Sequence, residues 1–151
     1  IPDHEKSYTA KVLLGVTTDT LDITGTVTGE FSVNVTPQET EKAVLSFYGE
    51  FEKNNETCIG FCGYKDFEKW LSGMNNRRTG KNLPDGYVKE NFYLCYENGE
   101  MIGVFSLKFE LTDYLFNYGG HIGYAVRPDK RNRGFATEML KKGLKLQKNL
   151  K

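Results

Sequence analysis

The sequence predicts an α/β (α+β) fold: a mixed, mainly antiparallel sheet flanked by helices, with an extra β-hairpin near the N-terminus. Three observations lead to this prediction. An Asn-Gly turn at residues 98–99 separates two alternating apolar runs, which is a strong hairpin signal. Apolar residues recur at helical spacing before and after that hairpin. The first 35 residues are rich in Val, Thr and Ile, which favours strands.

The bulk properties indicate a single ordinary domain. The chain has 151 residues, 38% of them apolar, and no run approaches the roughly 18 apolar residues of a membrane span. No secretory signal opens it. Cys58, Cys62 and Cys95 form no Cys-x-x-Cys pair, which favours reduced thiols and gives no metal site. We therefore expect a cytoplasmic protein without a bound metal.

The first elements are two strands and a helix. The strands are expected at residues 8–16 and 23–35, with a polar connection between them. The helix is expected to begin after Thr36, because Thr36 suits the N-cap, Pro37 the first helical position, and Glu39 completes a capping box. One face of this helix is apolar and is predicted to be core.

The rest of the chain reads as a helix, a loop, a three-stranded meander and a last helix. Residues 63–71 are expected to form a short amphipathic helix, and the polar residues 74–88 a loop. Two strands flank the turn at residues 97–100, and residues 122–126 form the third strand. The last helix is expected from Phe135 to about Asn149.

The most informative segment runs from Gly119 to Ala136 and reads GGHIGYAVRPDKRNRGFA. It places a small-residue turn between an apolar strand and a helix. Unpaired N–H groups at a helix start form a ready anion site. Lys130, Arg131 and Arg133 add positive charge, so the segment suits a phosphate or pyrophosphate.

The pattern Arg131-x-x-Gly134-x-Ala136 resembles the acyl-CoA signature of the GNAT acetyltransferase superfamily, and the resemblance continues over residues 53–151. It implies a GNAT-like sheet, acetyl-CoA (coenzyme A) as the cofactor, and acetyl transfer to the amine of a small molecule or peptide. The resemblance places Val126 and Arg127 along the pantetheine arm of the cofactor. Its pyrophosphate site would comprise Arg131, Asn132, Arg133, Gly134, Phe135 and Ala136.

An amine must lose a proton before it attacks a thioester, so a base is needed. Glu110 and His121 are the candidate catalytic residues, because both border the inferred cleft. Each has an alternative role, Glu110 as a strand-end carboxylate in solvent and His121 as a hydrogen-bonded core imidazole. The family's usual acid, a Tyr on a later helix, would follow Lys151, so the sequence also predicts an enzyme impaired by truncation.

Residues 4–52 resemble a second family, the bacterial tRNA pseudouridine synthase that acts on the T-loop uridine, chiefly through the run Thr18 to Gly25. The resemblance would place Tyr8 against the target base, whereas the simpler interpretation makes Tyr8 a core aromatic. The catalytic Asp of that family would lie upstream of this chain. The sequence thus predicts a chimera-like chain, with segments 1–52 and 53–151 packed as one domain.

Charge separates the hypotheses. Residues 1–52 carry a net charge of −6, which is unsuited to RNA phosphates, and residues 127–151 carry +7, which suits nucleic acid or a ligand with several phosphates. Three hypotheses remain: a GNAT acyltransferase, an inactive folded chimera that self-associates, and a pseudouridine synthase fragment, with tRNA the least favoured partner. An open sheet edge further favours a homo-dimer or swapped oligomer.

Overall fold

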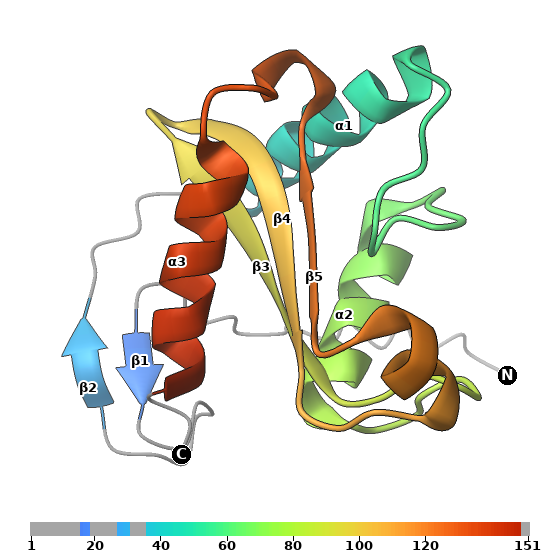
Figure 1. Ribbon diagram of the computed structural model, residues 1–151. Helices are drawn as coiled ribbons and strands as arrows, with labels where there is room; N and C mark the ends of the chain where they lie inside the picture. The colour runs from blue at the N-terminus through green and yellow to red at the C-terminus, as the bar shows by residue number, and fades with distance from the viewer. Residues whose placement is uncertain (1–15, 19–26, 31–35, 149–151) are drawn as a thin grey trace, which may run out of the picture. The chain divides into compact units, whose positions relative to one another are not determined.

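A computed structural model describes residues 16–18, 27–30 and 36–148 of the chain (Figure 1). The chain divides into two compact units, residues 1–35 and residues 36–149, which are described separately. In the first unit, β1 (Val16–Thr18) and β2 (Val27–Glu30) pair antiparallel. The extra N-terminal strand pair is therefore present, and the remainder of the expected strands at residues 8–16 and 23–35 lies outside the described residues.

The second unit is a three-stranded antiparallel sheet in the order β3-β4-β5, with helices on both faces (Figure 1). Successive residues of β4 face opposite sides of the sheet. Phe105 lies against α3. Ser106 bonds on the other side to Glu90, which Arg77 of α2 also contacts. This arrangement confirms the predicted α+β fold. The elements are α1 (Pro37–Lys53), α2 (Phe67–Thr79), β3 (Glu90–Glu97), β4 (Glu100–Lys108), a π-helical turn η1 (Leu115–Gly119), β5 (Ile122–Val126), a 3-10 turn η2 (Pro128–Lys130) and α3 (Phe135–Lys148).

The start of α1 has the predicted capping box. The backbone N–H of Glu39 donates to Thr36 Oγ1 at 3.2 Å, and the N–H of Thr36 donates to Glu39 Oε2 at 2.7 Å. These two bonds satisfy donors that a helix start otherwise leaves unpaired. Val44, Phe47 and Phe51 are buried on the predicted core face. The division of the chain at residue 52 stays a prediction, and α1 packs within the second unit.

The prediction for residues 63–88 was wrong in its helix boundaries. Helix α2 begins at Phe67, where Asp66 Oδ1 accepts a hydrogen bond from Lys69 N at 2.8 Å, and it continues through residues 74–79. It ends at Gly80, whose φ of 72° gives the left-handed conformation that terminates helices. Residues 74–79, most of them polar, are thus helical, and Arg77 among them donates to Glu90 of β3, a tertiary contact without a local sequence signal.

The predicted hairpin between β3 and β4 is confirmed. Asn98 and Gly99 have φ angles of 50° and 79°, so both central residues of the turn adopt the positive φ that a type I′ turn requires. Leu94 pairs with Val104, and a register shift occurs between Cys95 and Tyr96. The predicted third strand and last helix are also present, as β5 and α3.

The core between the sheet, α1 and α2 is an aromatic cluster around Phe61, which is 1% exposed. The Phe61 ring stacks on Trp70 of α2 at 5.0 Å between ring centroids and lies 5.8 Å from Phe47 of α1 and 6.2 Å from Phe92 of β3. Trp70 Nε1 donates to the carbonyl of Gly60 at 2.9 Å.

None of the helices in the described part of the chain has the length and apolar character of a membrane span.

On the other face, α3 approaches β4 through glycines. A Cβ on the buried Gly143 of α3 would overlap the ring of Phe105. A Cβ on Gly103 of β4 would lie 2.7 Å from Met139 Sδ and 2.8 Å from the carbonyl oxygen of Ala125. The two glycines therefore set how closely α3 lies against the sheet.

Gly143→Ala is expected to lower the free energy of unfolding by about 1–3 kcal/mol, because the added methyl group overpacks Phe105. Gly49→Ala is the matched control: Gly49 also lies within a helix, but a Cβ there meets nothing within 4 Å. The control should raise stability by roughly 0.5–1 kcal/mol through helix propensity alone. Urea denaturation of both variants measures the difference, and equal stabilisation by both would contradict close packing at Gly143.

Candidate functional site

The larger of two cavities that the described residues form, about 580 Å³ in volume, lies beside β5 and the start of α3. We call it the β5 groove. One wall comes from the end of α1 and the loop after it, and the other from β5 and the segment leading into α3. Its lining residues are Phe51, Glu56, Thr57, Ile59, Tyr124, Ala125, Val126, Lys130, Arg131, Asn132, Gly134, Phe135, Ala136 and Thr137.

Helix α3 opens at one end of this groove. The carbonyl of Gly134 accepts from Glu138 N at 3.2 Å, so the N–H groups of residues 135–137 precede the first intrahelical donor. Asn132 and Gly134 have positive φ angles of 62° and 82°. A Cβ at Gly134 would meet no protein atom within 4 Å, so this position favours glycine for its backbone conformation, and no steric contact demands it.

Arg131 lines the groove but is paired within the protein. Its guanidinium binds the Glu56 carboxylate with both terminal nitrogens, one of them at 2.9 Å from Oε1, and its Nε donates to the Val126 carbonyl at 3.2 Å. The Arg131 hydrogen bond holds the pKa of Glu56 below its usual value, and Glu56 in turn raises the pKa of Arg131. Both groups are therefore charged at neutral pH, and each neutralises the other.

The groove includes six of the eight residues predicted to bind the cofactor: Val126, Arg131, Asn132, Gly134, Phe135 and Ala136. Arg127 does not line it. Its buried guanidinium lies 2.9 Å from Glu100 Oε1 and 2.9 Å from Asp129 Oδ1, so it links β4, β5 and η2. Arg133 is exposed outside the lining. The cofactor-binding roles of all eight residues stay predictions.

The two candidate bases lie at the opposite end of β5 from α3. Glu110 is exposed, two residues beyond β4. His121 directly precedes β5, and its Nδ1 lies 2.9 Å from the Lys108 carbonyl. His121 is exposed, so the alternative of a core imidazole is wrong. Neither residue lines a described cavity, and their catalytic roles stay predictions.

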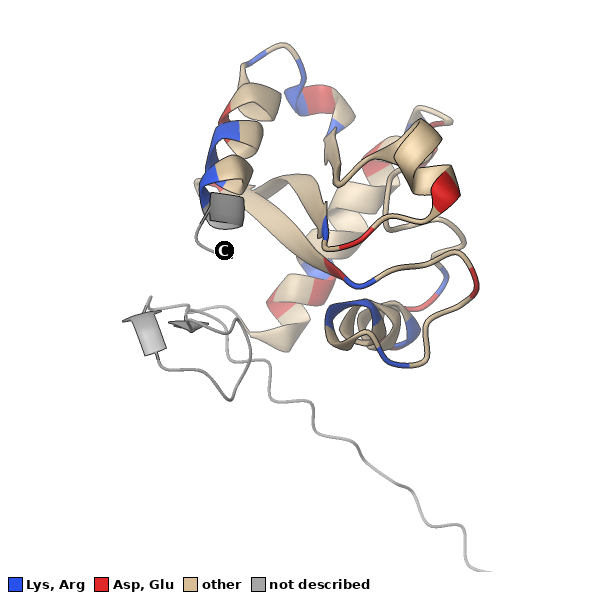
Figure 2. Ribbon diagram, turned by 60° about the horizontal axis from the view of Figure 1, so that its bottom comes forward, with Lys and Arg blue, Asp and Glu red and all other residues tan. Residues whose placement is uncertain are grey.

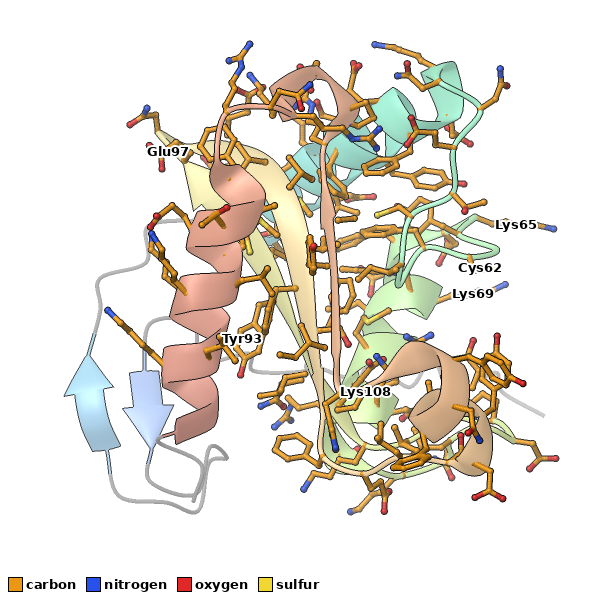
Figure 3. All side chains as sticks on the ribbon, in the orientation of Figure 1. Cys62, Lys65, Lys69, Tyr93, Glu97 and Lys108 are labelled. Atoms are coloured by element: carbon orange, nitrogen blue, oxygen red, sulfur yellow. The ribbon has the colours of Figure 1, made fainter. Side chains whose placement is uncertain are left out.

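A second cavity, about 240 Å³, adjoins the groove through Ile59, which lines both. We call it the Arg77 pocket. It contains the buried carboxylate of Glu90, which accepts from Arg77 Nη1 at 2.8 Å and from Ser106 Oγ at 2.5 Å. Lys108, labelled in Figure 3 at the end of β4, places its Nζ 3.6 Å from Glu90 Oε2.

Sequence reasoning missed this pocket. It also missed the wall of the β5 groove that comes from the end of α1 and the loop between α1 and α2. A signal for the pocket was present, because Ser106 and Lys108 are polar residues at alternate positions of an otherwise apolar strand, and both share one face with Glu90. The contact between Glu56 and Arg131 joins residues 75 positions apart and has no such signal.

Two of the three thiols, those of Cys58 and Cys95, are poor nucleophiles at neutral pH. All three cysteines are free. Burial raises the pKa of Cys58 to about 12 and that of Cys95 to about 11, so both thiols are protonated at neutral pH. The third thiol, that of Cys62, is exposed and lines neither described cavity.

Positive charge extends from the groove along α3 (Figure 2). Arg131 and Arg133 precede the helix, and its exposed face carries Lys141, Lys142 and Lys145. Lys141 pairs with Glu138 one turn earlier, at 2.9 Å. The basic groups closest to the groove are therefore those before the helix, while the lysines of α3 form a solvated surface.

Comparison with known proteins identifies two similarities. Among curated proteins, tRNA pseudouridine synthase B of Thermotoga maritima is 45% identical over 51 residues, covering 34% of this chain and 16% of that protein. The same enzyme of Alkaliphilus oremlandii is 41% identical over 83 residues, covering 54% of this chain and 28% of that protein. The chain thus matches less than a third of the length of either relative, and the longer match extends beyond a 52-residue segment. No solved structure gives a significant match.

The second similarity covers the part of the chain that forms the site. The sequence model of the acetyltransferase (GNAT) family matches residues 73–150, slightly more than half of the chain. The matched region contains most of α2, the whole three-stranded sheet, and the basic loop that leads into α3. The chain therefore belongs to the acetyltransferase (GNAT) family.

Proposed function

We propose that this chain is a GNAT-type N-acetyltransferase that binds acetyl-CoA in the β5 groove and transfers its acetyl group to an amine. The observation that carries the proposal is the position of the α3 N-terminus: within a GNAT-family sequence, it opens with basic residues into a groove of about 580 Å³. A helix N-terminus and an arginine together attract phosphate oxygens. Phe135, Ala136 and Thr137 would supply backbone donors and Arg131 a charged one.

The reaction exchanges one bond for another. The neutral amine nitrogen attacks the thioester carbonyl carbon, a C–N bond forms, and the C–S bond breaks. The nitrogen loses a proton, and the sulfur leaves as a thiolate and takes one. A base is needed at the thioester end of the groove, away from the pyrophosphate. Glu110 and His121 are our candidates, because Glu110 follows β4 and His121 precedes β5, both at the end of the sheet away from the start of α3.

Two further properties belong to this proposal. A homo-dimer or swapped oligomer is supported by β5, which among the described strands pairs with β4 alone and so presents an outer edge. A cytoplasmic location is supported by the three free thiols.

Gly134→Val is expected to weaken acetyl-CoA binding by about tenfold or more, because valine disfavours the positive φ that shapes the helix start. Arg131→Ala should weaken it several-fold through loss of a phosphate donor. Titration calorimetry measures both affinities. Lys141→Ala removes a charge on α3 outside the groove and should leave the affinity unchanged. Equal affinity in all variants would place any binding elsewhere.

Glu56→Gln is expected to bind acetyl-CoA a few-fold more tightly than the wild type, because Glu56 competes with the phosphates for Arg131 and such exposed pairs are weak. The Arg131 hydrogen bond lowers the pKa of Glu56, so this competition persists at neutral pH. It ends as the pH falls through that lowered pKa, and the two proteins should then converge. Calorimetry at several pH values measures the difference. Weaker binding by the variant would show that Glu56 holds Arg131 in place.

The similarity to tRNA pseudouridine synthase B raises a second candidate function, tRNA modification, which the charge of the N-terminal segment argues against. We expect no pseudouridine above background when the chain is incubated with unmodified tRNA, because residues 1–52 carry a net charge of −6 that repels RNA phosphates. Nucleoside analysis by mass spectrometry measures the product. Pseudouridine formed in proportion to the added protein would instead establish the second function.

A further inference from the structure

The Arg77 pocket lies where a second substrate would meet the β5 groove. Ile59 lines both cavities, and the consecutive residues Gly123 and Tyr124 of β5 line the pocket and the groove respectively. A Cβ on Gly123 would lie 3.2 Å from Ile59 Cδ1 and 3.8 Å from Lys108 Nζ. The lack of a side chain at Gly123 therefore keeps space open between Ile59 and the Lys108 ammonium group.

The charged groups of the pocket carry a surplus of positive charge. Its charged lining residues are Arg77, Lys108 and Glu90, two cations and one carboxylate. Both Glu90 oxygens already have partners, Oε1 with Arg77 and Oε2 with Ser106. Glu90 is 5% exposed, so it has little capacity to pair with an ammonium group from solvent. Among the described residues that line the pocket, no carboxylate is left to pair with an added positive charge. Lys108 Nζ makes only long contacts, 3.4 Å to Ser106 Oγ and 3.6 Å to Glu90 Oε2, so both cations keep donors for a ligand.

Arg77 is held in place for such contacts. Its guanidinium carbon lies 4.5 Å from the centre of the Tyr87 ring, and its Nη1 is bound by Glu90. A guanidinium fixed by stacking and by one carboxylate keeps other N–H groups in a planar fork that fits a second carboxylate. Tyr87, Phe92 and Leu115 give the pocket apolar walls.

We propose that the Arg77 pocket binds the acceptor amine and selects acceptors that carry a carboxylate, such as an amino acid or the carboxyl end of a short peptide. The carboxylate pairs with Arg77 and Lys108, the apolar part lies against the aromatic walls, and the amine reaches toward Ile59 and the groove. Acceptors whose only charge is positive, such as polyamines, are disfavoured by the same two cations. This inference rests on the proposed acetyl transfer.

The test compares product analogues that differ only in the carboxylate. N-acetyl-phenylalanine and N-acetyl-leucine are titrated against their carboxamides, in the presence of coenzyme A, by calorimetry. Because the amine is already acetylated, differences in amine basicity play no part. The acids are expected to bind about tenfold more tightly than the amides, because a carboxylate forms stronger hydrogen bonds with Arg77 and Lys108 than a neutral carboxamide does.

Two variants locate the effect and a third controls for it. Lys108→Gln and Arg77→Gln should each reduce the preference for acid over amide, while Arg78→Gln, on the same helix and bonded to Asn75 outside the pocket, should retain it. Acetyl-CoA titration of the same samples separates the hypotheses. Failure of the wild type to bind acetyl-CoA would overturn the proposed function. Intact acetyl-CoA binding, with acids and amides bound equally or neither bound, would overturn the pocket assignment alone.

Discussion

The site depends on the packing of one side chain, Phe61. Its ring fills the space between α1, α2 and β3 and contacts aromatic residues of all three. The two residues before it, Ile59 and Gly60, form walls of the cavities. Gly60 has a φ of 78°, and a Cβ there would overlap the Phe92 ring, so the backbone passes directly over β3. Burial of Phe61 therefore places a loop that has no regular structure of its own.

A second constraint is the neutralisation of cations inside the protein. Arg131 pairs with Glu56, Lys130 with Glu100 at 2.6 Å, and Arg77 with Glu90. These pairs differ in exposure, and hence in strength. Glu56 and Arg131 are 38% and 41% exposed, so solvent screens their pairing and makes it weak. Glu90 is buried, and removal of a partner would leave an unpaired charge, so its contacts are permanent. The β5 groove thus contains a weak, exposed ion pair, and the Arg77 pocket contains a buried one.

The sequence predicted those features whose cause is local. The capping box of α1, the turn at Asn98 and Gly99, and the strand and helix around the basic loop each follow from a few neighbouring residues. Features that depend on tertiary contacts were missed. Helix α2 continues past its apolar face to Thr79, where Arg77 reaches Glu90, and Arg131 is neutralised by Glu56 of the loop after α1. A linear pattern shows which groups are charged but not which partner each one finds.

The GNAT family model begins at residue 73, yet part of the β5 groove lies before it. Phe51, Glu56 and Ile59 come from α1 and the loop that Phe61 anchors. Helix α1 nevertheless completes the core, with Val44 and Phe47 in one cluster with Met101 and Val104 of β4. A core accepts any helix with apolar residues of suitable size and spacing, so α1 needs no family signature to fill this place. Residues of the segment 51–59 line the β5 groove, and Ile59 also lines the Arg77 pocket, so both cavities depend on a part of the chain that precedes the family match.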